Sequence, residues 1–184
     1  MDSHVESAYL RELGDECEFA LLSLQEMNRA FKEPNGTVRV FRCAQDFLQH
    51  SGAISRILWP PPSAGARAKA RGAHLTQALG VTDPHPLEKR SLRNHLEHFD
   101  ERIDDWAESS VNRNIADRII LPRREMFNLG SIMTEKDIFR MFESDTLHYI
   151  FRGEEFDMQA LCDGIQDIQR RVQNQLGELQ RAKP

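Results

Sequence analysis

Residues 3–32, SHVESAYLRELGDECEFALLSLQEMNRAFK, decide the fold class of this chain of 184 residues. Apolar side chains recur in this stretch at intervals of three or four, which is the spacing of one face of an α-helix. These positions are Val5, Tyr9, Leu13, Cys17, Ala20, Leu24, Met27 and Phe31. We therefore expect one long amphipathic helix. It ends at EPNG (33–36), because Pro and Gly follow its last periodic residue.

Two more helices are expected directly after this turn. The first runs from Thr37 to Leu58, and WPPPSAG (59–65) ends it because three successive prolines remove backbone donors. The second is a shorter, alanine-rich helix over about 66–79. It carries a basic cluster, which is either a solvated helix face or a surface that faces phosphate. The members of this cluster are Arg67, Lys69 and Arg71.

The second half of the chain mixes helices with one β-element. A long helix is expected from Pro86 to about Ser110, since Pro suits the first turn of a helix. Residues 111–136 are expected to be mainly a connection, with a short helical turn over about 112–118. Two runs rich in β-branched and aromatic residues then flank a turn at 143–146 and predict a β-hairpin over about 137–152. A last helix begins near Phe156, and its apolar face consists of Leu161, Ile165, Ile168, Val172, Leu176 and Leu179.

Together these elements predict an all-α fold, a bundle of four main helices with one small β-hairpin attached. The length suits a single domain over residues 1–184. A hairpin of two strands is not stable alone, so we expect it to pack against the bundle or a partner chain.

Composition excludes several classes of protein and of site. The chain has 40% hydrophobic and 29% charged residues, no apolar run long enough to span a bilayer, and no secretion signal at its start, so we expect a cytoplasmic protein with no membrane partner. Its three cysteines lie far apart and predict buried thiols, with neither a metal site nor a cofactor. The net charge of -5 argues against a general nucleic-acid coat protein but leaves room for a local basic cleft.

RSLRNHLEHFDERIDDW (90–106) is the most unusual stretch of the chain. On a wheel of about 100° per residue, its apolar residues gather on one face, which we expect to face the core. They are Leu92, Leu96, Phe99, Ile103 and Trp106, with His95 near their edge. Asn94, His98 and Arg102 form a polar ridge away from that face, which is either a binding surface or an ordinary solvated face.

The residues Arg93-Asn94-His95-Leu96-Glu97-His98 resemble the R-x4-H motif of the HEPN superfamily of all-helical proteins. That superfamily contains metal-independent ribonucleases, many of them toxins or defence effectors, and members without catalysis. The resemblance implies a helical bundle, usually dimeric, in which two copies of the motif face a shared cleft. Arg93 lies about 140° from His98 on an ideal helix. Pairing between subunits would bring the Arg of one copy to the phosphate approached by the His of the other.

This resemblance leads to a functional hypothesis, an HEPN-like endoribonuclease or RNA-binding relative. RNA supplies its own nucleophile, the 2′-hydroxyl, so a base and a cation suffice without a metal. His98 is the expected general base or acid because its ordinary pKa lies near neutrality, and the planar guanidinium of Arg93 suits phosphate oxygens. Asn94 would orient the histidine or bind the RNA backbone, and Arg90 and Arg102 are expected to bind substrate. The expected partners are RNA, a second copy of the chain, and an antitoxin or other protein.

Two alternatives stay open. In the first, the two histidines of this stretch bind a metal with nearby acids, although Asp100 and Asp104 fall on the far flank of the wheel. In the second, the chain is a non-catalytic helical scaffold for an unknown partner, and the stretch is a helix laced by charge pairs. The enzyme classes with a nucleophile elbow, a Walker-type loop or a dinucleotide-binding glycine motif are excluded, because these motifs do not occur in the sequence.

Overall fold

A computed structural model of the chain describes residues 1–82, 84–89, 99–111, 113–122, 125 and 133–181. The chain divides into two compact units, which we describe separately. The first unit consists of residues 1–23, 46–90 and 160–184. The second consists of residues 24–45 and 91–159.

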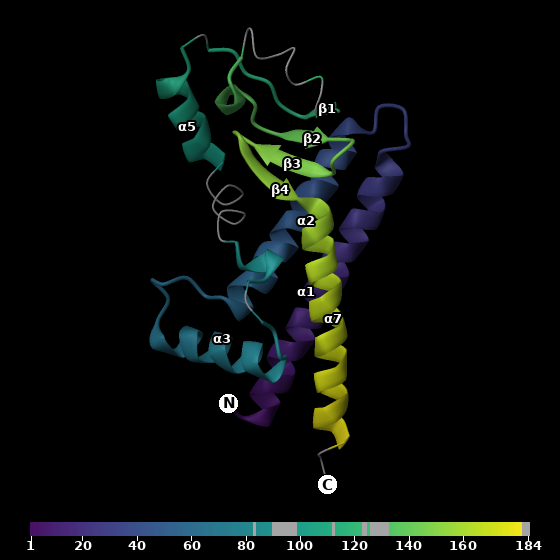
Figure 1. Cartoon of the computed structure of the whole chain (residues 1–184), viewed down its shortest axis with the longest axis vertical. Helices are drawn as coiled ribbons and strands as arrows, with labels where there is room; N and C mark the ends of the chain where they lie inside the picture. Colours follow the sequence, from purple (N-terminus) through teal and green to yellow (C-terminus); the bar gives the residue numbers. More distant parts are fainter. Residues whose placement is uncertain (83, 90–98, 112, 123–124, 126–132, 182–184) are drawn as a thin grey trace. The chain divides into compact units, whose positions relative to one another are not determined.

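The described helices follow most of the predicted periodicity (Figure 1). The α-helices are α1 (Ser3–Ala30), α2 (Thr37–Leu58), α3 (Ala66–Ala78), α5 (Phe99–Ser109) and α7 (Met158–Arg181), and the 3-10 helices are η1 (Pro86–Glu88) and η2 (Glu135–Asp137). The expected helices over 3–32, 37–58 and 66–79 are therefore confirmed. Among the described helices, none combines the length and the apolar character that crossing a membrane requires.

The first unit has an apolar core made by segments of α1, α2, α3, η1 and α7. Its buried side chains are Leu10, Leu13, Cys17, Ala20, Phe47, Leu48, Ile54, Leu58, Leu75, Leu79, Leu87, Leu161, Cys162, Ile165, Ile168 and Val172. Polar contacts tie the same helices together at the edge of the core. Glu16 lies 2.7 Å from Nδ1 of His50, and Nη1 of Arg171 donates to the carbonyl oxygens of Leu79 and Gly80. The predicted face of the last helix is confirmed from Leu161 to Val172.

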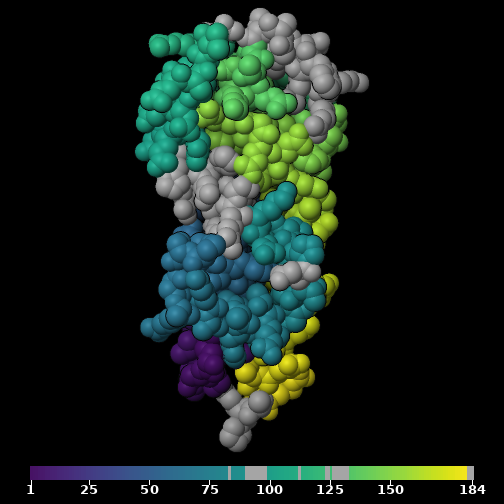
Figure 2. Space-filling model, turned by 60° about the vertical axis from the view of Figure 1, so that its left-hand side comes forward, coloured from purple at the N-terminus to yellow at the C-terminus, as the bar shows by residue number. Residues whose placement is uncertain are grey.

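Helix α3 lies at the surface of the first unit, next to the N-terminal residues of α1 (Figure 2). It starts after the proline-rich turn, as the sequence predicts, and it packs closely on that turn. A Cβ atom at the buried Gly72 would lie 2.6 Å from Cδ of Pro60 and 2.7 Å from the carbonyl oxygen of Leu58. Only glycine therefore lets the helix approach this close.

The second unit contains a four-stranded sheet in the order β1-β2-β3-β4 (Figure 1). The strands are β1 (Ile119–Leu121), β2 (Met141–Glu143), β3 (His148–Phe151) and β4 (Glu154–Asp157). Strand β1 is parallel to β2, and the other pairs are antiparallel. The rings of the paired residues Phe142 and Tyr149 contact Phe31 and Phe41, so the turn after α1 and the first residues of α2 cover one face. The predicted hairpin is confirmed, and it packs against helices as expected.

The sheet is larger than the sequence predicts, and the all-α class with one hairpin is wrong in this respect. Residues 113–118 form no helical turn, because Ala116 pairs with Ile138 and β1 follows. Arg140 holds this segment by donating from Nε to Oδ1 of Asp117 at 2.7 Å. The last helix begins at Met158, since residues 154–157 form β4. The four-helix HEPN-like bundle and the single domain over 1–184 stay predictions.

The long helix expected from Pro86 to Ser110 is wrong at its start. Residues 86–88 form one 3-10 turn, and Lys89 leaves it with a ψ of 115°, outside the helical range. The ring of His85 stacks on Trp59, and Leu87 is buried, so tertiary contacts hold this turn. The end of the expected helix is confirmed by α5, which runs to Ser109.

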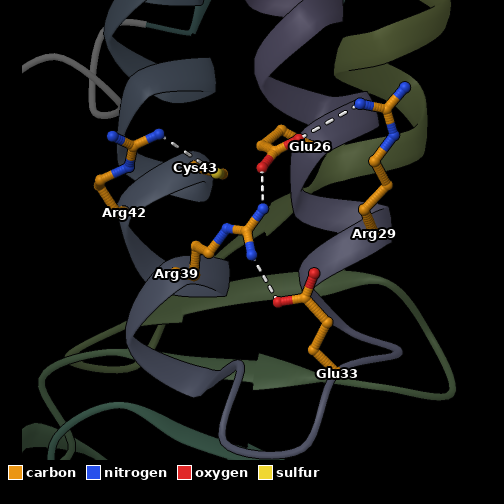
Figure 3. Close-up of polar contacts among 6 residues, drawn as sticks. All are labelled: Glu26, Arg29, Glu33, Arg39, Arg42 and Cys43. Carbon is orange, nitrogen blue, oxygen red and sulfur yellow. Dashed lines mark hydrogen bonds and ion pairs between the residues drawn. The ribbon is translucent and has the colours of Figure 1, made fainter.

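The turn between α1 and α2 depends on three local features. Asn35 has a φ of 63°, a conformation that Asn tolerates better than most residues. Gly36 approaches the end of α1 so closely that a Cβ atom there would lie 2.0 Å from the carbonyl oxygen of Ala30. Arg39 then bridges Glu26 and Glu33 across the turn (Figure 3).

A single carboxylate, that of Asp137, joins α5 to η2. Its Oδ1 accepts hydrogen bonds from Nε1 of Trp106 at 3.1 Å and from Oγ of Ser110 at 2.7 Å. Its Oδ2 accepts from the backbone N–H and the hydroxyl of Thr134 at 2.9 and 2.8 Å. The bonds from Ser110 and Thr134 hold the pKa of Asp137 below its usual range, although burial opposes this.

Replacing Gly36 with alanine is expected to lower the free energy of unfolding by roughly 1–3 kcal/mol, because the added methyl group must displace backbone. Gly177→Ala is the matched control. Gly177 lies in helix α7, and a Cβ atom added there would meet nothing within 4 Å. That variant is expected to be more stable by about 0.5–1 kcal/mol. Urea unfolding of both variants measures this, and equal shifts of the same sign would contradict the described turn.

Asp137→Asn is expected to lower the free energy of unfolding by about 1–3 kcal/mol at neutral pH, because an amide cannot accept all four hydrogen bonds. The pKa of Asp137 is lowered in the folded state. Its carboxylate therefore stabilises the fold above the ordinary carboxyl pKa, and this stabilisation is lost as pH falls through the pKa of the folded state. The difference between wild type and variant should therefore shrink in acid. Asp104→Asn, on the exposed side of α5, should leave stability nearly unchanged at every pH.

Candidate functional site

The residues that the sequence predicts as catalytic lie outside the described part of the chain. They are Arg93, Asn94 and His98, and the predicted substrate-binding residue Arg90 and the edge residue His95 lie outside it as well. Their roles stay predictions. Arg102 is the predicted site residue that the structure describes, and its surroundings therefore define the candidate site.

Helix α5 is turned differently about its axis than the wheel predicts. Phe99 and Trp106 are half-buried, and both rings contact Phe139. Arg102 is also half-buried, whereas Ile103, expected on the core face, is 41% exposed. The two residues flank the line from Phe99 to Trp106 on opposite sides. The indole Nε1 of Trp106 donates to Asp137 and to the carbonyl oxygen of Asn114, which holds this orientation, so Arg102 is not on the outer ridge.

Arg102 lines a cavity of about 490 Å³ between α5 and the segments around the sheet. The other lining residues are Asp105, Glu108, Ser109, Lys136 and Arg152. Nη1 of Arg102 donates to Oδ2 of Asp105 at 2.9 Å, and Nη1 of Arg152 donates to the carbonyl oxygen of Arg102. Within the described residues, the buried Nε of Arg102 has no hydrogen-bond partner.

Arg152 is the most constrained cation of this cavity. Its side chain is only 10% exposed, and its guanidinium lies 5.6 Å from the centre of the Phe139 ring. It also lies 3.9 Å from Asp105, which therefore faces two guanidinium groups. Lys136 extends toward the same cavity and has no ion pair within the part of the chain that the structure describes.

The charges of the lining favour an anionic ligand. Three cationic side chains face two carboxylates, so the lining has an excess of one positive charge. Both arginines pair with Asp105, which leaves Lys136 as the cation without an ion pair among the described residues. Planar guanidinium groups and an ammonium group are the side chains that bind phosphate oxygens best. No imidazole is among the described lining residues, so this cavity supplies binding groups and no base of near-neutral pKa.

Metal and thiol chemistry find no support in the described residues. No group of three or more His, Cys, Asp or Glu side chains among them is arranged to hold a metal ion. The metal alternative that uses His95 and His98 lies outside the described residues. All three cysteines are free and buried, as predicted, and burial raises the pKa of Cys17 to about 12.

Sequence reasoning missed Lys136 and Arg152 as members of the site. Both lie more than 30 positions from Arg102 along the chain and come near it only in the folded structure. A local signal was present for Arg152, because Arg152-Gly153 is the two-residue turn between β3 and β4, with φ values of 49° and 84°. Such a turn, with φ above zero at both positions, is typical of a tight β-hairpin.

Comparison with known proteins gives no relative for this fold or site. No protein-family model, no curated protein sequence and no solved structure matches the chain. Its function is therefore inferred from the residues of the chain alone.

Proposed function

We propose that this chain is an HEPN-like RNA-binding protein that cleaves RNA without a metal ion. The observation that carries the proposal is the cavity around Arg102, which is lined by three cations. In the sequence, Arg102 follows His98 by four positions and Arg93 by nine. A phosphate-binding cavity on α5 would therefore extend the substrate surface beyond the R-x4-H motif.

In this mechanism each side chain has one role. His98 takes the proton from the 2′-hydroxyl, and the resulting oxygen attacks the adjacent phosphorus and expels the 5′-oxygen, which receives a proton. Arg93 steadies the charge that develops on the phosphate oxygens, and Asn94 orients the histidine or the backbone of the RNA. Arg90, Arg102 and Lys136 hold neighbouring phosphates. No cofactor takes part.

A second copy of the chain would complete the site. The angle of about 140° between Arg93 and His98 on an ideal helix keeps one copy from directing both at one phosphate. In a twofold dimer the same patch from each copy meets at the axis, so the arginine of one subunit can serve the histidine of its partner.

RNA binding is tested by comparing Lys136→Gln with Lys32→Gln. Lys32 is exposed and lies outside the cavity lining, so the control substitution removes the same charge elsewhere. We expect Lys136→Gln to weaken binding of a single-stranded RNA and to lower the slope of log Kd against log salt by about 0.7, the value for one phosphate contact. Fluorescence anisotropy at several salt concentrations measures both quantities. Equal slopes for the two variants would remove the cavity from the RNA surface.

Cleavage is tested by incubating RNA with purified protein in EDTA. We expect activity from wild type and a loss of about 10²- to 10⁴-fold in His98→Ala. Mixing His98→Ala with Arg93→Ala in equal amounts should restore about a quarter of the wild-type rate, because half of the dimers then carry one intact site.

The outcomes separate three hypotheses: a ribonuclease, a non-catalytic RNA-binding relative and a helical scaffold. If wild type and His98→Ala leave the RNA equally intact, the catalytic reading is wrong. RNA binding that persists in that case supports the non-catalytic relative. Absence of both binding and cleavage supports the helical scaffold. Activity that is lost in each variant and is not restored by mixing would overturn the shared site.

A further inference from the structure

A second cavity, of about 520 Å³, lies in the first unit between α3 and the N-terminal residues of α1. Its volume falls in the range of sites that hold small organic molecules. Its lining is largely apolar, and several lining residues have small side chains. Val5 and Tyr9 line it from α1, and Ala68 and Ala70 line it from α3.

Basic side chains occupy one wall of this cavity. Arg67, Arg71 and His74 line it from one face of α3, since they are spaced by four and three residues. Lys69 is not part of the lining, because it falls about 200° from Arg67 on the helix. The basic cluster that the sequence predicts is therefore divided between the cavity and the solvent.

Arg71 is held in place before any ligand arrives. Its Nε and Nη2 donate to the carbonyl oxygens of Ile57 and Arg56 at 3.4 and 3.2 Å. Its guanidinium lies 5.3 Å from the centre of the Tyr9 ring, a cation–π contact. Nη1 has no hydrogen-bond partner among the described residues. A guanidinium fixed in this way loses little freedom when it binds an anion.

The nearby acids are already engaged with groups of the protein. Oδ1 of Asp2 accepts from the backbone N–H of His4 at 2.7 Å, which lowers the pKa of Asp2. Burial disfavours the charge of Glu6, but hydrogen bonds with His74 and Gln175 outweigh burial and hold the pKa of Glu6 below its usual range. Both acids stay charged, but Glu6 is not part of the lining. The guanidinium groups of Arg67 and Arg71 therefore outnumber the single lining carboxylate, that of Asp2, and the balance favours an anionic head group.

We propose that this cavity binds a small organic acid, with an aromatic or branched apolar body and one anionic head group. The apolar body would lie against Val5, Tyr9 and the alanines of α3, and the head group would meet Arg71 and Arg67. This inference is independent of the proposed RNA function, because its residues belong to the other unit.

The test uses two probes that share their rings and differ in charge. The anionic probe is 8-anilinonaphthalene-1-sulfonate, and the neutral one is N-phenyl-1-naphthylamine, which lacks the sulfonate. We expect the folded full chain to bind one equivalent of the anionic probe with a Kd on the order of 10 µM, as its number of heavy atoms implies. The neutral probe is expected to bind more weakly.

Four variants identify the site. Arg71→Gln should weaken the anionic probe about tenfold and leave the neutral probe nearly unchanged. Arg67→Gln, which alters an exposed side chain, should act in the same direction and keeps the test valid if Arg71→Gln loses stability. Lys69→Gln should change neither. Ala70→Leu should weaken both probes because its larger side chain takes up part of the cavity, whereas Ala73→Leu, outside the lining, should weaken neither.

Either of two results overturns the proposal. If Ala70→Leu leaves the fluorescence of the anionic probe unchanged, the probe lies elsewhere on the chain. If Lys69→Gln weakens the anionic probe as much as Arg71→Gln and Arg67→Gln do, the attraction is a general effect of charge. Circular dichroism of each variant confirms that loss of binding is not loss of fold.

Discussion

The carboxylate of Asp137 is the interaction on which the second unit depends. It gathers four hydrogen bonds from Trp106, Ser110 and Thr134, so a helix and a 3-10 turn share one buried acceptor. A buried carboxylate is costly unless its oxygens are satisfied, and here both are. The indole N–H of Trp106 donates to this carboxylate and to the carbonyl oxygen of Asn114, both at 3.1 Å, and these bonds favour one rotation of α5 about its axis. That rotation turns Ile103 outward and Arg102 toward the sheet.

The cavity around Arg102 follows from this anchor and from the sheet together. Strands β3 and β4 meet at a tight turn that carries Arg152, and the ring of Phe139 fixes the guanidinium of Arg152 beside α5. Cations from separate segments thereby face one space, although the whole chain has a net charge of -5. A local concentration of positive charge matters more for phosphate binding than the sign of the total. The acidic composition is thus compatible with an RNA surface.

The two cavities differ in the physical character of their linings. The cavity on α5 is lined by polar and charged residues of both signs, which suits an extended and hydrated ligand such as an RNA backbone. The cavity on α3 is mainly apolar and has its arginines on one wall, which suits a compact ligand with a single charged end. On α3 the helix itself presents two arginines four positions apart, whereas the cations of the α5 cavity come from separate segments of the chain. In both cavities, contacts with a carbonyl oxygen or a ring restrain one guanidinium.

The sequence by itself determined the helices of residues 3–30, 37–58, 66–78 and 158–181, because helical periodicity and the breakers EPNG and WPPP act locally. It also determined the central hairpin, whose turn residues are local as well. Only the tertiary structure decided that Ile119–Leu121 and Glu154–Asp157 join the sheet, since strands of three or four residues gain their stability from pairing partners. Likewise, only tertiary contacts decided which flank of α5 is inward and which cations surround Arg102. A helix pattern sets the angle between side chains, but the direction in which a face points depends on an acceptor 31 positions away.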